Sequence, residues 1–372
     1  LTLLVIQFFE RRDLFKYKKA ILLGLCVVAS SISHAWLYSF TTIIGMIFSS
    51  FVFRFYVVDP KLKLVSQFFA YCINWPAFVI EVFNDNNWLG YKTQDSNKWI
   101  TKVFALVFFP LIILMLFIVL YISSSDWLSN WYASYTIAID ASIFPIFILG
   151  FYVCFVFWNA KIYNFIKVWN DRLSFRYEPE QLKDLKSTNP AIPLDIEYKS
   201  GVITFSILNV LLFFYIIILN VENAQKGIQN LSEYSQRTHD QVYLIIVSVL
   251  LAMLVILFYF KGVLNFIQNN KLLVRLAKIW IILNGVLIIC ATYQNSLYVL
   301  ELGLTYKRLG VYLFLILCGF GLTFSYFKLL RKHKNFYLID QMAWTLYYSL
   351  IVCSLFNWSS LITRINLSNE NS

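Results

Sequence analysis

The feature that most constrains this chain is the length of its uncharged apolar runs. Residues 309–327 carry no charged side chain, and they are flanked by Lys307 and Arg308 on one side and by Lys328 on the other. A helix of about 20 apolar residues crosses the hydrocarbon core of a bilayer. We therefore expect this segment to be one membrane-spanning helix with cations at each end.

Apolar runs of this kind recur along the whole chain of 372 residues. Only 14% of the residues are charged, against about 25% in an ordinary soluble protein, so the runs do not form the inner face of one soluble core. The sequence predicts an all-α fold, a polytopic membrane helical bundle of about 9–10 transmembrane helices. The expected apolar segments are 21–58 (two spans that meet near His34–Ser39), 64–83, 103–122, 135–158, 201–220, 242–260, 279–295, 308–327 and 337–356.

The charges of the links predict an orientation. Lys261–Lys278 and Lys328–Lys334 contain four cations each and no acid, so the positive-inside rule places both in the cytoplasm. Counting back from them leaves two alternatives for the first half. A cytoplasmic N-terminus requires nine spans, with 64–83 as a tilted or re-entrant segment that does not cross, whereas ten spans place the N-terminus outside.

Four regions follow from this layout. The stretch 158–200 is predicted to be a cytoplasmic excursion of helix and loop, because about forty residues are too few to bury a core of their own. It separates an N-terminal membrane half, 1–157, from a C-terminal membrane half, 201–358. Residues 359–372 form an extracytoplasmic tail.

Small residues at a spacing of four occur inside two predicted spans. Gly45 is followed by Ser49, and Gly321 is followed by Ser325. Because small side chains let helix backbones approach closely in a membrane, we expect tight helix contacts at both places, within the chain or with a partner.

Ionisable residues in or beside a predicted span are candidate functional residues, because a charge within the bilayer is costly. Asp140 lies five residues before Pro145, which frees a helix carbonyl, so it is a candidate ion or proton site; the alternative is an interfacial carboxylate. His239 is followed by Asp240, which is placed to fix an imidazole tautomer. The alternative is that Asp240 only starts a helix.

Three charges bracket the outer end of span 308–327. Glu301, Lys307 and Arg308 form a candidate ligand site, and the two cations break the positive-inside pattern. Arg308 suits a phosphate or carboxylate because its guanidinium binds such groups in bidentate fashion. The alternative, which we favour, is that the cations pair with Glu301 or anchor to lipid headgroups. Asp340 is expected to pair with the cations of 328–334.

The sequence predicts no cofactor and no metal site, and it favours a non-enzymatic protein. It contains no glycine-rich phosphate loop, no nucleophile elbow and no metal-ligand spacing of histidines. The cysteines lie in apolar segments and are not spaced as a metal or redox pair. They are Cys26, Cys72, Cys154, Cys290, Cys318 and Cys353. Bound lipids are expected, and the net charge of +11 is assigned to topology and headgroup contact rather than to nucleic acid.

A set of residues in the second half of the chain resembles a known family. The set comprises Leu194–Val202, Leu208-Asn209, Thr238–Asp240, Lys261–Phe266, Trp280, Asn284, Leu304–Val311, Gly321-Leu322, Lys328, Trp358 and Asn366, with Pro110 and Leu120-Tyr121 upstream. Together these residues resemble the bacterial, Bacteroidota-type multi-pass membrane family catalogued as domain of unknown function 4173, close to 4153.

The resemblance covers roughly residues 100–367, and the first hundred residues are only generically similar. Leu283 stands where the family pattern has a glutamine, so a polar partner beside Asn284 is expected to be lost. The resemblance implies a bacterial inner-membrane protein and implies no reaction, substrate or cofactor.

Three functions remain open at this point. The first is a non-enzymatic scaffold or partner-binding subunit of an envelope membrane complex, located in the bacterial inner membrane. The second is a transporter or ion-coupled carrier with Asp140, His239 and Arg308 along its path. The third is a membrane sensor that acts through the excursion 158–200 on a separate partner.

Overall fold

All regular elements of the protein are helices in the part of the chain that its computed structural model describes. These residues are 17–84, 150, 152, 161–176, 194–225, 231–260, 263–266 and 270–370, with some helical stretches described by their backbone alone. The helices are α2 (Lys18–Leu37), α3 (Phe40–Val58), α4 (Leu64–Asn84), α9 (Asn164–Arg172), α11 (Leu194–Gln225), α12 (Leu231–Tyr259), the 3₁₀ turn η3 (Val263–Asn265), α13 (Lys271–Leu302), α14 (Tyr306–Leu330), α15 (Asn335–Leu355) and α16 (Trp358–Glu370).

Six helices of this described part are long and apolar enough to cross a membrane. They are α2, α3, α11, α13, α14 and α15. The expected polytopic helical membrane protein is confirmed, and each segment predicted between residues 201 and 356 falls essentially within one helix. The predicted spans 103–122 and 135–158 lie almost wholly outside the described residues.

Several helices are longer than the spans that the apolar pattern predicts. α11 and α13 have 32 residues each, which corresponds to about 48 Å of helix rise. The hydrocarbon core is only about 30 Å thick, so the polar ends of both helices extend beyond it. The first residues of α11, from Leu194, therefore lie within the stretch 158–200 that is predicted to be an excursion of helix and loop.

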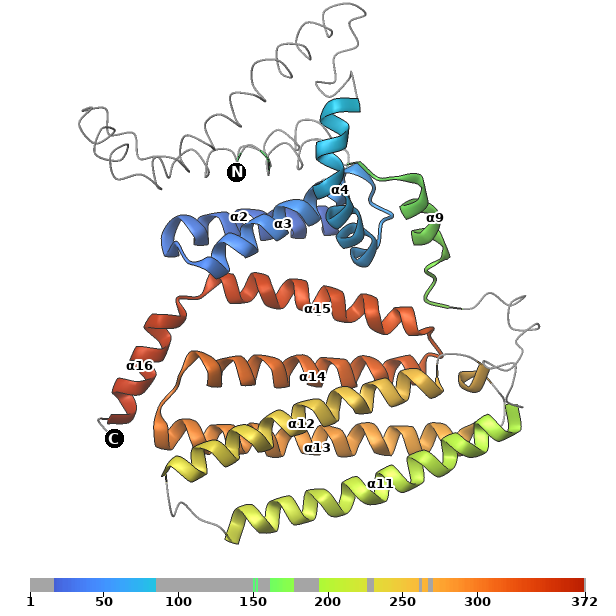
Figure 1. Ribbon diagram of the computed structural model, residues 1–372, viewed down its shortest axis with the longest axis vertical. Helices are drawn as coiled ribbons and strands as arrows, with labels where there is room; N and C mark the ends of the chain where they lie inside the picture. Colours follow the sequence, from blue (N-terminus) through green and yellow to red (C-terminus); the bar gives the residue numbers. More distant parts are fainter. Residues whose placement is uncertain are drawn as a thin grey trace, which may run out of the picture.

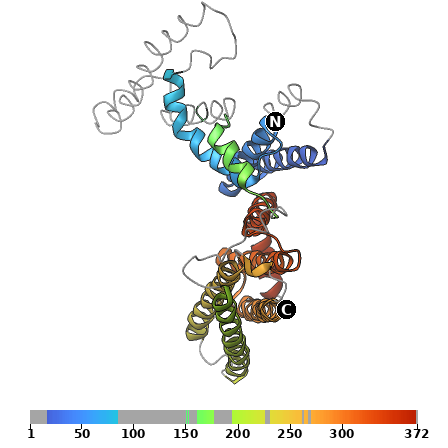
Figure 2. The same cartoon turned by 90° about the vertical axis from the view of Figure 1, so that its right-hand side faces the viewer.

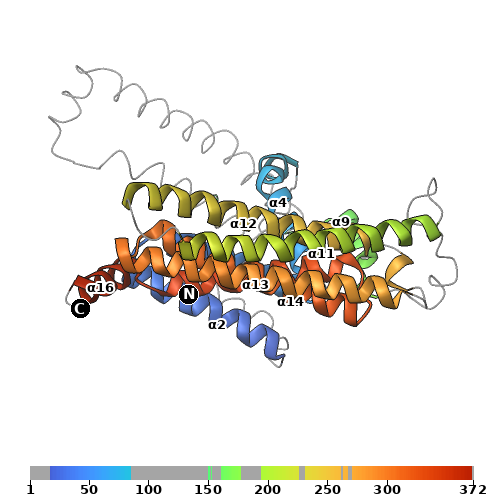
Figure 3. The ribbon, with the colours of Figure 1, turned by 90° about the horizontal axis from the view of Figure 1, so that it is seen from below.

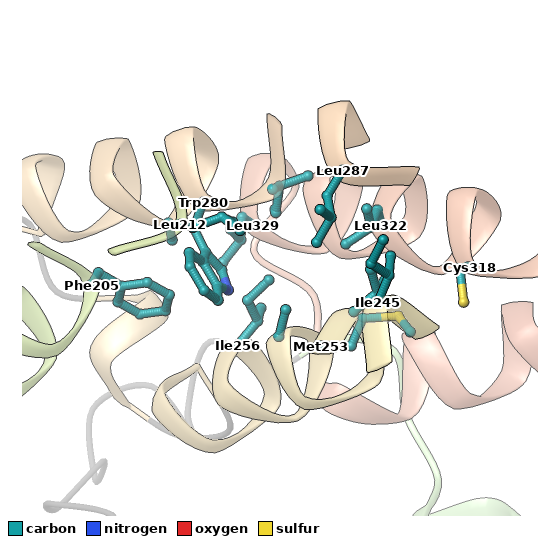
Figure 4. Packing of buried hydrophobic residues seen from close by; sticks show 14 of the residues in the cluster. Phe205, Leu212, Ile245, Met253, Ile256, Trp280, Leu287, Cys318, Leu322 and Leu329 are labelled. Carbon is teal, nitrogen blue, oxygen red and sulfur yellow. The ribbon is translucent and has the colours of Figure 1, made fainter. Parts of the chain in front are cut away.

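Helices α11, α12, α13 and α14 pack together and form what we call the C-terminal block. Their shared core contains Phe205, Trp280, Ile256 and Leu322, whose side chains lie along the interior between the helices (Figure 4). A Cβ atom added to Gly321 would lie 2.5 Å from Sδ of Met253, so this glycine permits the contact between α12 and α14. The close packing expected at Gly321 is thereby confirmed.

Helices α2, α3, α4 and α9 form the N-terminal block, and α15 lies between the two blocks (Figures 1 and 2). Ser49 and Ser30 place their hydroxyl oxygens 2.8 Å apart where α2 meets α3. A Cβ atom on Gly45 would lie 2.7 Å from Ser354 of α15. Gly45 and Ser49 are therefore both at close helix contacts, as their spacing predicts.

The cationic links share one end of the structure, which we call the cationic end; the opposite end is the distal end. Lys328 contacts Phe260 and Asn265 contacts His333, so the links after α12 and α14 meet there. α2 begins toward this end as well, because its second residue, Lys19, lies close enough to Asp340, in the second turn of α15, to act on its charge. This arrangement agrees with the expectation that both cationic links lie on one side of the membrane.

α4 differs in direction from the neighbouring spans. It begins at Leu64 beside the cationic end and runs across the direction of α14 and α15 (Figures 1 and 3). The sequence leaves open a tilted segment at 64–83, marked by Asn74 and Pro76. The assignment of 64–83 as a tilted or re-entrant segment that does not cross the membrane stays a prediction.

Candidate functional site

The turn between α13 and α14 lies at the distal end, and its residues suit the backbone conformation that it adopts. Gly303 has φ +76°, a conformation that glycine adopts without strain. Thr305 caps α14, because its hydroxyl accepts a hydrogen bond from the backbone N–H of Arg308 at 3.4 Å. The turn thus fixes the distal ends of two neighbouring spans.

Arg308 ties this turn to the end of α13. Its side chain is only 8% exposed, and Nη1 donates hydrogen bonds to the carbonyl oxygens of Leu302, at 2.7 Å, and Gly303. The guanidinium lies over the ring of Tyr298, with Cζ 3.9 Å from the ring centroid. The last carbonyls of a helix lack partners within the helix and carry partial negative charge. Arg308 therefore stabilises the distal end of α13.

α16 is held against the same turn at both of its ends (Figure 1). Oδ1 of Asn366 accepts the backbone N–H of Leu304 at 2.6 Å, and Nδ2 donates to the Leu304 carbonyl at 3.0 Å. A Cβ on Gly303 would lie 3.1 Å from Oδ1 of Asn366, so a larger residue there would have to displace this amide by a few tenths of an ångström. Near the start of α16, the hydroxyl oxygens of Ser359 and Tyr306 lie 2.5 Å apart.

We call α16 together with residues 301–307 the distal platform. Its exposed side chains combine apolar and charged groups, and they include Glu301, Lys307, Leu361, Arg364 and Leu367. Among the residues that the structure describes, no ion pair joins Arg308 to Glu301; the arginine is bonded to backbone carbonyls instead. The platform is therefore a structured surface, and Arg308 does not neutralise the exposed carboxylate of Glu301.

The other predicted site residues are not tested by the structure. Asp140 lies outside the described residues. His239 and Asp240 belong to the backbone of α12, but their side chains also fall outside the described part. The ion site at Asp140 and the imidazole pairing at His239 therefore stay predictions.

A second charged cluster lies at the cationic end, where α15 meets the N-terminal block. Asp340 is 5% exposed, and its Oδ1 accepts no hydrogen bond from the described residues. The charges that act on it are Lys19 and Lys63. The expected pairing with the cations of 328–334 is wrong, because α15 turns this face, which also carries Tyr347, toward α2 and α3.

The two lysines of this cluster also contact neutral groups. Nζ of Lys63 donates to the carbonyl oxygen of Asn170 at 2.8 Å and to that of Leu173. Nζ of Lys19 lies 4.3 Å from the ring centroid of Trp344. The cluster thus joins the starts of α2, α4 and α15 to the end of α9, and it fixes how these helices meet.

The link between α14 and α15 also directs polar groups inward. Lys328 is fully buried, and Nζ donates to the carbonyl oxygen of Phe260 at 2.8 Å. His333 is 6% exposed and stacks on Tyr337, with ring centroids 4.4 Å apart. Burial lowers the pKa of His333 below its ordinary value, and the positive charge of Arg176 acts in the same direction. Both residues serve packing at this end.

Several residues that carry the family resemblance hold backbone groups in place. Asn209 donates to the Leu276 carbonyl at 3.0 Å. Asn284 donates to the Trp280 carbonyl at 2.8 Å, while its own oxygen has no partner among the described residues. Asn209 thereby joins α11 to α13, whereas the hydrogen bond of Asn284 stays within α13.

One family model matches almost the whole chain. The family described as Domain of unknown function (DUF4153) matches residues 19–371. This match confirms the 4153-like resemblance and extends it into the first hundred residues. No curated protein and no solved structure matches the chain.

Proposed function

The chain belongs to the family described as Domain of unknown function (DUF4153), and from its contacts we propose that it is a non-enzymatic, partner-binding subunit of a membrane complex. In this proposal it lies in the cytoplasmic membrane of a bacterium. The cationic end faces the cytoplasm, and the distal platform faces out, where a partner subunit docks. The proposal involves no cofactor, and membrane lipids are the other partners.

The observation that carries the proposal is that α16 is fixed at both ends. A short helix with few buried apolar contacts is readily opened unless other contacts hold it in place. Here the side chain of Asn366 binds the turn that precedes α14. The hydroxyl of Ser359 binds that of Tyr306, the first residue of α14. A surface ordered before binding avoids the entropy cost of ordering on contact, and this favours recognition of a partner.

The exposed residues of the platform support the same conclusion. Leu361 and Leu367 present apolar area on α16, and Arg364 lies between them along the helix. Lys307 adds a second exposed cation from α14. Apolar contacts surrounded by charged groups are the usual composition of an interface between proteins.

The contacts of the buried cations support a non-enzymatic role. Nη1 of Arg308 and Nζ of Lys328 already donate to backbone carbonyls. Donors that satisfy helix ends are not free to polarise a substrate or to stabilise a developing charge. Both cations therefore serve the architecture that carries the platform.

Affinity purification in a mild detergent tests the proposal. We expect a second protein to co-elute in constant ratio with the wild type, and to be lost from the double variant Leu361→Glu with Leu367→Glu. Leu272→Glu is the matched control, because Leu272 is an exposed leucine of α13 at the cationic end. It should retain the partner.

Two outcomes contradict the proposal. One is a purified wild type with no co-eluting protein under conditions in which the chain stays folded. The other is a partner that persists in the double variant. Thermal melting of each variant in detergent shows whether a loss of partner reflects the surface or the fold.

A further inference from the structure

An apolar groove lies between the N-terminal block and the helices α14 and α15. Its volume is about 570 Å³, within the range of about 300–1,000 Å³ that small-molecule sites occupy. Four helices form its wall: α3, α4, α14 and α15. Examples of the side chains that they contribute are Ile44 and Phe48 of α3, Phe68 of α4, Leu317 of α14 and Leu350 of α15. The groove is separate from the distal platform, so its ligand is independent of the function proposed above.

The groove is elongated along the spans. Its wall on α3 extends from Thr41 to Phe55, which corresponds to about 21 Å of helix rise. On α15 the wall extends from Ala343 to Cys353. A length of this order exceeds half of the hydrocarbon thickness of about 30 Å. The occupant that fits is therefore long and thin and lies roughly parallel to the helices.

Most of the wall is aliphatic or aromatic, with a few polar side chains that include Thr41, Ser349 and, near the cationic end, Gln67. Gln67 of α4 is 1% exposed and is part of the wall. Its Nε2 donates to the Leu62 carbonyl at 3.1 Å, whereas Oε1 accepts no hydrogen bond from the described residues. A buried acceptor without a partner is destabilising, because it has lost its hydrogen bonds to water. A ligand with a hydroxyl or ammonium group at this position would remove that destabilisation.

The surroundings of the groove identify the chemical class of the ligand. α3, α14 and α15 are membrane-spanning helices, so the groove lies at the depth of the hydrocarbon core. An empty cavity of this size forfeits the dispersion contacts of its wall. Lipid chains are the apolar molecules available at this depth. We propose that the groove binds one acyl chain of a membrane phospholipid.

The same geometry favours an anionic headgroup. The wall begins on α4 at Leu64, directly after the link that carries Lys61 and Lys63. Lys61 is exposed, and exposed cations at the membrane surface attract anionic lipids. A chain that fills the groove places its phosphate beside this link. The ligand is thus an anionic phospholipid with its headgroup at the cationic end.

Photolabelling in nanodiscs tests the proposal. The probe is phosphatidylglycerol with a diazirine in one acyl chain, and peptide mass spectrometry locates the label. In the wild type we expect label on peptides of α3, α14 and α15 that form the wall. Ile44→Trp fills the groove from α3 and should lose this label. Ile43→Trp should keep it, because Ile43 is exposed on the same helix and is not part of the wall.

A second matched pair on another helix guards against misfolding of one variant. Leu317→Trp should lose the label, whereas Ile316→Trp should keep it, because Ile316 is 55% exposed and lies outside the wall. All variants are compared by thermal melting and by the homogeneity of the purified protein.

Three results would overturn the proposal in whole or in part. The first is that wall peptides are labelled no more strongly than the lipid-exposed face of α11; this would exclude a bound acyl chain, and it is the result expected if a polypeptide segment fills the groove. The second is that label persists in both groove-filling variants, which would also exclude a bound chain. Equal labelling by a diazirine phosphatidylcholine would overturn the anionic preference, and Lys61→Gln should weaken labelling by phosphatidylglycerol alone.

Discussion

The contact between α3 and α15 at Gly45 makes a quantitative prediction. In Gly45→Ala the new methyl group would lie 2.7 Å from both Cβ and Oγ of Ser354, about 1 Å inside the optimum separation of carbon atoms. The contacted Cβ is fixed to the backbone of α15, so no side-chain rotation relieves the overlap. We expect overpacking to cost about 1–3 kcal/mol, set against about 1 kcal/mol that alanine gains over glycine in a helix.

A matched control isolates the steric cost. Nothing lies within 4 Å of a Cβ on Gly319, so Gly319→Ala should gain about 1 kcal/mol from helix propensity alone. Titration with sodium dodecyl sulfate in mixed micelles measures the free energy of unfolding of both variants. Their difference should be about 1–3 kcal/mol. Ser354→Gly, added to Gly45→Ala, should recover part of the loss. Equal stability of Gly45→Ala and Gly319→Ala would refute the reasoning.

The remaining single-residue predictions concern the two ends of the bundle. Arg308→Lys should lower the free energy of unfolding by about 1–3 kcal/mol, because an ammonium group cannot both bind two carbonyls and stack on Tyr298; an unchanged thermal melt would contradict this. Burial lowers the pKa of His333, so the unfolded chain binds that proton more readily than the fold does. Stability should therefore fall as the pH drops below the ordinary value of 6.5 and level off below the lowered pKa of the fold. A pH series of melts should show this dependence in the wild type and lose it in His333→Gln.

The positions of the spans follow from the sequence because their cause is local. An apolar run bounded by cations requires only its own residues to be recognised, and α14 (Tyr306–Leu330) contains the whole predicted span 308–327. The lengths of α11 and α13 are less predictable, because polar residues continue a helix beyond the bilayer without any apolar signal. The capped turn at Thr305, in contrast, has a recognisable sequence.

Close helix contacts were predictable in position but not in partner. Gly45 and Gly321 both lie where a Cβ would collide with a neighbouring helix. The sequence cannot say that Ser354 and Met253 are the neighbours, because any helix that approaches a small residue gains the same packing. The partner is set by tertiary structure, which the spacing of small residues does not encode.

The charges of the candidate site show the same limit. The break in the positive-inside pattern marks Lys307 and Arg308 as unusual, yet the acceptors of Arg308 are backbone carbonyls, which have no sequence signal. The role of Asn366 likewise has no sequence signal, because it depends on α16 folding back on Leu304. The sequence draws attention to Asp340 and predicts partners in 328–334, but the cations that act on it, Lys19 and Lys63, come from the opposite half of the chain.

Asp340 provides a test that separates the structure from the simpler expectation of pairing within its own link. Asp340→Asn leaves Lys19 and Lys63 without the carboxylate that acts on both, and we expect a loss of about 1–3 kcal/mol in the free energy of unfolding. If the structure is right, Lys19→Met added to Asp340→Asn should recover part of that loss, because it removes an uncompensated charge. Lys334→Met should not. Rescue by Lys334→Met instead would show that Asp340 pairs with the link before α15, and the docking of the N-terminal block would then need another source of specificity.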